Sequence, residues 1–78
     1  MNYLLDLPLH WNHHLAKKIR TYRKAHNLTQ KQLADKMEIL EQRLHQIETF
    51  SQPITVVELS NLMAIFELTY KQFFDDNL

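Results

Sequence analysis

Residues 30–48, QKQLADKMEILEQRLHQIE, restrict the possible folds of this 78-residue chain more than any other stretch. The apolar residues recur at helical spacing in two groups on either side of a short break: Leu33, Ala34 and Met37, then Ile39, Leu44 and Ile47. Only a side chain as small as that of Ala34 lets a second helix cross closely over the first. The stretch therefore predicts two short helices at a fixed angle, the second of which faces outward.

The second of these helices carries hydrogen-bonding side chains on its outward side. Leu44 and Ile47, three residues apart, anchor it to the core. The polar residues are Glu41, Gln42, Arg43, His45 and Gln46. This is the layout of a helix-turn-helix, in which one helix buttresses the other and the second offers polar side chains to DNA base edges.

Around this motif the chain resembles the Cro/CI-type (XRE) family of bacterial and phage DNA-binding domains. The resemblance covers roughly residues 15–75 and consists of an ordered series of short matches: Ile19-Arg20, Arg23, Leu28-Thr29-Gln30, Leu33-Ala34, Leu44, Ile47-Glu48, Pro53, Leu59, Leu62, Phe66-Glu67-Leu68-Thr69 and Phe73-Phe74. It implies an all-α fold, a compact five-helix lambda-repressor-like helix-turn-helix domain that binds operator DNA as a dimer.

The chain departs from the family pattern in the turn of the motif. Glu38 stands where the family usually has glycine, and Leu40 stands where serine or threonine usually caps the recognition helix; the loop after Glu48 is also about one residue shorter. Since the chain contains no glycine, Glu38 must adopt a costly left-handed conformation or the turn is built differently. A recognition helix without a side-chain cap is expected to be less stable.

Capping signals set the expected helix boundaries. Thr29 with Gln32, Thr55 with Glu58 and Thr69 with Gln72 each form the sequence pattern of a capping box. The first expected helix runs from about Asn12 or His13 to His26, and the second begins at Gln30. The other three are expected over residues 41–48, 56–66 and 70–75. In the first helix, Leu15, Ile19 and Tyr22 form the buried stripe and Arg20 lies on the outer face. Asn27 then tolerates the left-handed conformation that ends this helix.

The domain organisation is predicted as an N-terminal arm, residues 1–12, followed by the helix-turn-helix domain, residues 13–78. The arm is too apolar for a solvated tail, because it contains Tyr3, Leu5, Leu7, Leu9 and Trp11 among others. Its alternation around Pro8 favours an extended segment. Such a segment either folds over its own core or docks on a partner.

The composition indicates the cellular compartment and argues against a membrane protein, a metal-binding protein and an enzyme. The chain lacks cysteine, an apolar run of the roughly 20 residues that a membrane span requires, and a secretory leader, which together fit the cytoplasm. Three histidines, His10, His13 and His14, lie close together, but Asp6 is the only nearby carboxylate, so neither a metal site nor a cofactor is predicted. No pattern of catalytic groups indicates an enzyme.

The charge is zero in total but unevenly distributed. Residues 15–46 carry eight basic and three acidic side chains, whereas residues 47–78 carry Lys71 against five acidic side chains. Such a domain can turn its basic half toward phosphates. The alternative is an ordinary solvated surface of mixed charge.

The predicted DNA-reading residues lie in the first turns of the helix over 41–48. Gln42 and Gln46, one turn apart, suit adenine, and Arg43 can fork onto guanine. Glu41 either accepts a hydrogen bond from cytosine or positions Arg43. His45 either contacts DNA or faces solvent.

The remaining predicted contacts are to phosphates. The resemblance assigns Gln30 to a phosphate and to the support of a reading side chain, and the backbone N–H groups there are ready for an anion. Further predicted phosphate partners are Lys18, Lys31, Lys36, Thr49 and Ser51. The resemblance also implies a partly buried, structural ion pair between Arg23 and Glu48.

These features predict a sequence-specific, homodimeric repressor that reads the major groove of operator DNA with helix 41–48. The alternative is an antitoxin of a toxin–antitoxin operon, which uses the apolar arm or the acidic end to bind a protein partner and autoregulates its promoter. A third hypothesis is a domain that has lost DNA binding and serves only in protein interaction. The neutral net charge and the residues Glu38, Leu40 and Glu41 favour this hypothesis.

Overall fold

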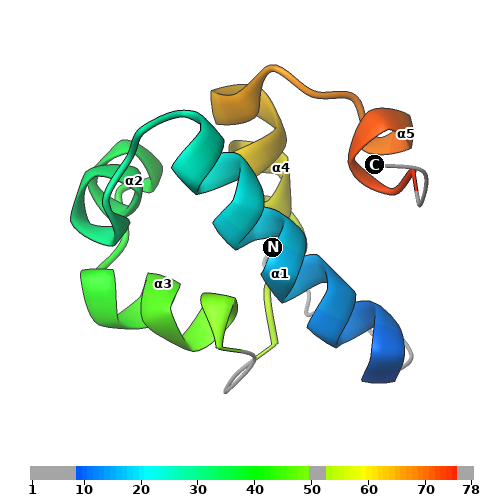
Figure 1. The fold of residues 1–78 in the computed structure, drawn as a ribbon. Helices are drawn as coiled ribbons and strands as arrows, with labels where there is room; N and C mark the ends of the chain where they lie inside the picture. The colour runs from blue at the N-terminus through cyan, green and yellow to red at the C-terminus, as the bar shows by residue number, and fades with distance from the viewer. Residues whose placement is uncertain (1–8, 50–52, 76–78) are drawn as a thin grey trace.

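Five helices account for most of the chain in a computed structural model that describes residues 9–49 and 53–75, with side chains from residue 13 onward. They are α1 (Leu9–Ala25), α2 (Gln30–Met37), α3 (Glu41–Glu48), α4 (Val56–Phe66) and α5 (Tyr70–Phe73). Helix α1 crosses the molecule, with α2 and α3 together on one side and the short α5 at the other end of the bundle (Figure 1). The predicted five-helix, all-α fold is therefore confirmed.

The core is built from one apolar stripe of each helix, as the helical spacing predicted. Its buried members include Ile19 on α1, Leu33 on α2, Leu44 on α3, Leu62 on α4 and Phe73 on α5. Ala34 is 1% exposed, which agrees with the expected close crossing of α2 and α3. Rings of α1 contact those of α4 and α5, since the centroid of Tyr22 lies 5.7 Å from each of Phe66 and Phe73.

The start of the first helix was predicted wrongly. Helix α1 begins at Leu9 rather than at Asn12 or His13, so residues 9–12 are helical instead of extended. Proline is tolerated in the first turn of a helix, so Pro8 does not prevent a helix from beginning beside it. Residues 1–8, which make up the rest of the predicted arm, lie outside the described residues. The division into an arm and a domain stays a prediction, as does the antitoxin alternative, which assigns partner binding to the arm or to the acidic end.

The other helix boundaries follow their predicted capping signals. Thr29, Thr55 and Thr69 each form a complete capping box with the residue three positions later. Helix α5 ends at Phe73, two residues earlier than expected. Leu40 caps α3 without a side-chain hydrogen bond and is 76% exposed. Among the described residues, no helix combines the length and apolar character needed to cross a bilayer.

Three helices end in the same left-handed turn, although the chain has no glycine. Asn27, Glu38 and Glu67 have φ of 58°, 58° and 56°. In the turn after α2, the Ile39 N–H donates to the Ala34 carbonyl and the Glu38 N–H to the Asp35 carbonyl, which is the hydrogen-bond pattern of a Schellman motif. The same pattern follows α1 and α4.

The residue after each left-handed position is apolar and packs against the core: Leu28, Ile39 and Leu68. An apolar contact at this position commonly accompanies the motif. These contacts offset the backbone cost of about 1–2 kcal/mol that a left-handed residue with a Cβ atom incurs. The turn between α2 and α3 is thus built as in the glycine-containing family pattern, with Glu38 in the strained position.

Replacing Glu38 with glycine removes the Cβ clash, so we expect Glu38→Gly to raise the free energy of unfolding by about 1 kcal/mol. Urea denaturation measures the change. The matched control is Ala64→Gly within α4, which should lower the free energy of unfolding by about 0.5–1 kcal/mol because glycine is costly inside a helix. Destabilisation by both substitutions would contradict the strain at Glu38.

Candidate nucleic-acid interface

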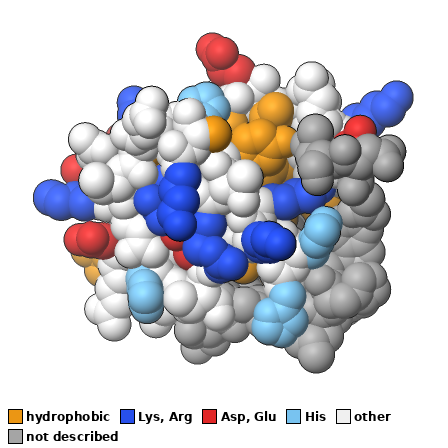
Figure 2. Space-filling model, in the orientation of Figure 1, with side chains coloured by type: hydrophobic (Ala, Val, Ile, Leu, Met, Phe, Trp, Pro, Cys, Tyr) orange, Lys and Arg blue, Asp and Glu red, His pale blue; other side chains and the backbone are white. Residues whose placement is uncertain are grey.

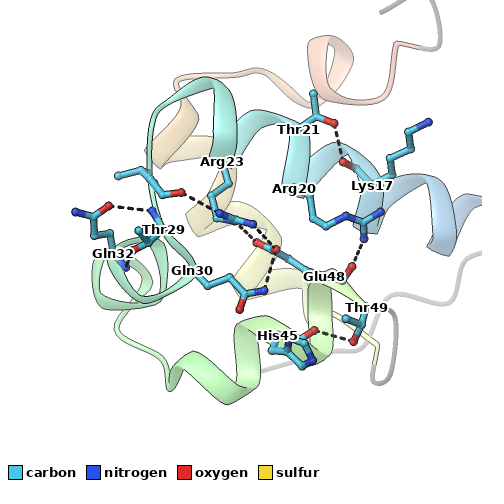
Figure 3. A network of polar contacts seen from close by, with 11 residues as sticks. Lys17, Arg20, Thr21, Arg23, Thr29, Gln30, Gln32, His45, Glu48 and Thr49 are labelled. Atoms are coloured by element: carbon cyan, nitrogen blue, oxygen red, sulfur yellow. Dashed lines mark hydrogen bonds and ion pairs between the residues drawn. The ribbon is translucent and has the colours of Figure 1, made fainter.

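Helix α3 is fixed to the rest of the domain through Glu48, its last residue. The Glu48 side chain is 1% exposed, and its carboxylate accepts hydrogen bonds from Arg23 Nε at 2.7 Å and Arg23 Nη2 at 3.1 Å (Figure 3). Gln30 Nε2 donates to the same carboxylate at 3.1 Å. The ion pair expected between Arg23 and Glu48 is present and joins α1 to α3. The hydrogen bond from Gln30 adds α2.

Arg20 adds a contact that the sequence interpretation missed. It was expected on the outer face of α1, but it is half-buried and its Nη1 donates to the Glu48 carbonyl. A cation at the end of a helix satisfies one of the carbonyl groups left without an intrahelical partner. The spacing from Arg20 to Arg23 is one helical turn, so the two cations share a face; this spacing is the signal that could have identified the contact.

Several polar side chains of α3 are open to solvent. Glu41, Gln42 and His45 are exposed and Gln46 is half-buried. Gln30, Glu41, Gln42 and His45 line one open depression, so the N-terminus of α2 and the outward side of α3 meet there. Four predicted site residues are therefore brought to one surface, although they come from two helices. Gln46 lies one helical turn after Gln42.

Two of the predicted DNA-binding cations have partners within the domain instead. Lys18 Nζ donates to the Phe73 carbonyl at 2.6 Å and to the Asp75 carbonyl at 2.7 Å, which holds the end of α5 against α1. Arg43 Nε donates to Glu58 Oε2 at 2.8 Å and Arg43 Nη2 to Glu58 Oε1 at 2.6 Å. In this structure both cations bond within the domain, and the predicted contacts of Lys18 with phosphate and of Arg43 with guanine stay predictions.

The other predicted residues differ in their positions. Lys31 and Lys36 are exposed on α2, and Lys31 Nζ lies 3.6 Å from Asp35 Oδ2 in a solvated pair. Thr49 is exposed, and its hydroxyl donates to the His45 carbonyl at 2.8 Å. Ser51 lies outside the described residues. Among the residues that are described, no group of three or more histidine, aspartate and glutamate side chains is placed to hold a metal ion.

Basic side chains are prominent on the face that α1 crosses. In Figure 2 they form a broken band across the middle of this face, and acidic side chains lie toward its margins. Helix α1 carries five basic residues: Lys17, Lys18, Arg20, Arg23 and Lys24. That the positive charge of the first half of the chain faces DNA stays a prediction, and several of these cations bond within the domain.

The charge of Glu58 depends on Arg43. Partial burial of the Glu58 carboxyl favours its neutral form and raises its pKa, but hydrogen bonds from Arg43 and Thr55 outweigh this effect and lower the pKa overall. The hydrogen bond with Glu58 also raises the pKa of Arg43. Both groups are therefore held in their charged forms at neutral pH.

A model of the helix-turn-helix family (HTH_3) matches residues 19–72. The chain belongs to the XRE-type helix-turn-helix family. Membership of this family places the chain among the DNA-binding regulators of the XRE type. No match was found among curated proteins.

Solved structures agree with this assignment. The chain is similar to the N-terminal DNA-binding domain of SinR from Bacillus subtilis, with 23% identity, coverage of 83% of this chain and 96% of that chain, and a TM-score of 0.73. A point mutant of the restriction-modification controller protein C.Esp1396I is 26% identical over 80% of each chain, with a TM-score of 0.72. A third similar structure is that of SinR, the master regulator for biofilm formation, in complex with DNA. It is 22% identical over 78% of this chain and 98% of that chain, with a TM-score of 0.69.

Removing one partner of the buried ion pair should strand the other charge. We expect Arg23→Ala to lower the free energy of unfolding by about 3–5 kcal/mol, because the Glu48 carboxylate then lacks its main partner away from water. Lys31→Ala is the matched control, since it breaks a solvated pair and should change the free energy of unfolding by less than about 0.5 kcal/mol. Equal effects of the two substitutions in urea denaturation would contradict a special role for Glu48.

The lowered pKa of Glu58 predicts a defined loss of stability in acid. A carboxyl whose pKa is lower in the folded than in the unfolded chain stabilises the fold above the unfolded value, about 4.3 for glutamate, and this contribution is lost as the pH falls through the folded value. We expect Glu58→Gln to remove part of the decrease in unfolding free energy below about pH 4.3. Urea denaturation from pH 7 to pH 3 measures it, and identical pH profiles for the two proteins would contradict the prediction.

Proposed function

We propose that this chain is a homodimeric repressor that places α3 in the major groove of operator DNA. One observation carries the proposal: α3 offers Glu41, Gln42, His45 and Gln46 to solvent while Glu48, the last residue of the same helix, is buried and bonded to α1 and α2. A helix that is rigidly attached on one side and polar on the other suits base recognition, because the reading side chains must be held in register.

Each exposed side chain on α3 has a role that its chemistry supports. Gln42 and Gln46 each carry a donor and an acceptor, the combination that pairs with adenine in the major groove. Glu41 can accept a hydrogen bond from a cytosine amino group, and His45 can donate to a base or a phosphate. Leu40, which is 76% exposed at the start of the helix, suits contact with a thymine methyl group.

The start of α2 supplies the phosphate contacts in this proposal. Gln30 and Lys31 occupy the first turn of that helix, where backbone N–H groups and the helix dipole favour an anion. Lys36, in the last turn of α2, and Thr49, at the C-terminal end of α3, are weaker candidates. Gln30 also donates to Glu48, so a phosphate bound at Gln30 would be coupled to the position of α3.

A homodimer would cover large apolar side chains that α4 and α5 leave exposed. Val57 is 44% exposed and Tyr70 is 50% exposed. Val57 and Ser60 share a face of α4, and the Ser60 hydroxyl lies 2.7 Å from the Tyr70 hydroxyl, which links α4 to α5. Pairing two copies through this surface would present two α3 helices to half-sites about 34 Å apart.

Selection of bound duplexes from a random pool tests the proposal. We expect a two-fold symmetric site with half-sites about one helical turn apart, and a loss of about 10³-fold or more in affinity between 50 and 200 mM salt. Gln42→Ala should weaken binding to the selected site by about 1–3 kcal/mol and relax its preference at one base pair. Lys31→Ala, the matched phosphate variant, should weaken all sequences alike.

Two results would reject parts of this proposal separately. Enrichment of no sequence, with salt-dependent binding to every duplex, would contradict base reading by α3. A selected site with a single half-site, together with a monomer in sedimentation equilibrium at the concentrations used, would contradict the homodimer while leaving the DNA-reading surface in place.

A further inference from the structure

The guanidinium of Arg43 is held by three hydrogen bonds at the border between α3 and α4. Two go to the Glu58 carboxylate, as described above, and Nη2 also donates to the Pro53 carbonyl at 2.8 Å. The side chains of Arg43 and Glu58 are 24% and 11% exposed. Arg43 therefore lies along the protein surface and toward α4, rather than extending from α3 into solvent.

These bonds use up the donors that an arginine needs to recognise a guanine. A guanidinium binds two acceptors at once along either of two edges, one formed by Nε–H and Nη2–H and the other by Nη2–H and Nη1–H. In this structure Nε–H and both hydrogens of Nη2 are already donated. Only the Nη1 hydrogens remain, so neither edge can fork onto a base or a phosphate while the Glu58 contact is in place.

Glu58 is itself held in position by its own helix. It is the third residue of α4, and its Oε1 accepts from the Thr55 N–H at 2.9 Å while its N–H donates to the Thr55 hydroxyl at 3.1 Å. Turning the carboxylate away would therefore break the capping box of α4 as well as the ion pair. The acceptor is preorganised, and Arg43 bonds to it where it stands.

Position 43 is at the edge of the DNA-facing side of α3. Successive residues on a helix are separated by about 100°, so Arg43 lies beside Gln42 on the flank that is opposite to Gln30. A long cationic side chain released from this position would reach the phosphates that border the groove. Since a phosphate contact carries no sequence information, it would strengthen binding to every duplex.

We propose that Glu58 is a specificity-determining residue that withholds Arg43 from DNA. Base recognition by α3 then depends on Glu41, Gln42, His45 and Gln46, and binding to unrelated sequences stays weak. Arg43 acts as a positioning residue, which ties α3 to the start of α4. This inference rests on the proposed DNA-binding function and extends it to the ratio between specific and non-specific affinity.

Glu58→Gln tests the proposal in the full chain. Glutamine at this position can still complete the capping box with Thr55 but cannot hold Arg43 as an ion pair. The affinity for the selected site and for an unrelated duplex is measured from 50 to 200 mM NaCl. We expect tighter binding to the unrelated duplex, a several-fold lower specificity ratio, and a plot of log affinity against log salt that steepens by about 0.9 for each phosphate newly contacted.

Two controls separate the release of Arg43 from a simple change of charge. Glu38→Gln removes one negative charge from the same domain, at an exposed side chain that makes no hydrogen bond or ion pair within the described residues. It should leave the salt slope as in the wild type. Arg43→Ala combined with Glu58→Gln should return the slope to the wild-type value. If Glu58→Gln does not fold, Arg43→Lys provides the second test. An ammonium group cannot bind the carboxylate through two parallel N–H groups as a guanidinium does, so this variant should also steepen the slope.

The outcomes distinguish this proposal from the proposed function. Absence of salt-dependent DNA binding by the wild-type chain would reject both. Normal wild-type binding with the same slope for Glu58→Gln and Glu38→Gln would reject only the role of Glu58. A slope that decreases by about 0.9 in Arg43→Ala alone would also reject it, because Arg43 would then already contact a phosphate in the wild-type complex.

Discussion

The arrangement of the domain depends on a single buried carboxylate. Glu48 ends α3, and its side chain receives hydrogen bonds from Arg23 on α1 and Gln30 on α2, while its carbonyl receives one from Arg20 on α1. A buried carboxylate is costly unless its oxygen atoms are satisfied. Because α1 and α2 both supply donors, the position of α3 cannot change without breaking bonds to each of these two helices.

The backbone supports the same arrangement from the other end of α3. The turn that leads from α2 into α3 is a Schellman motif with Glu38 in the left-handed conformation, and Ile39 packs on the core directly after it. Glu38 has a Cβ atom, so it bears the backbone strain that glycine would avoid at this position. Leu40 contributes no side-chain cap. The start of α3 is thus held by packing and backbone hydrogen bonds, and its end is held by the hydrogen bonds and the ion pair of Glu48.

The sequence predicted most of the fold because its signals are local. Capping boxes and helical spacing are read over four to eight residues, and the structure reproduces the starts of α2, α4 and α5 that they indicated. The partners of Arg43 and Arg20 lie 15 and 28 residues away. Local spacing cannot reveal such a partner, so an arginine that bonds within the domain has the same local pattern as one exposed for DNA.

Glu58 illustrates why that ambiguity arises. The capping box explained its presence at the start of α4, and a residue with one adequate explanation gives no reason to look for a second. Only the packing of α3 against α4 brings its carboxylate to Arg43. The outward side of α3, in contrast, needed no tertiary information, because Gln42, His45 and Gln46 are placed there by helical spacing alone.

The same long-range bonds change the meaning of the charge distribution. Of the eight basic residues between positions 15 and 46, four donate to groups within the domain: Lys18, Arg20, Arg23 and Arg43. Lys17, Lys24, Lys31 and Lys36 are the exposed members of the set. Non-specific binding to DNA rises with the number of cations that reach phosphates. In this neutral chain, half of these cations bond within the domain. Under the proposed function, more of the affinity for DNA must therefore come from base contacts, which depend on the position of α3 that Glu48 holds.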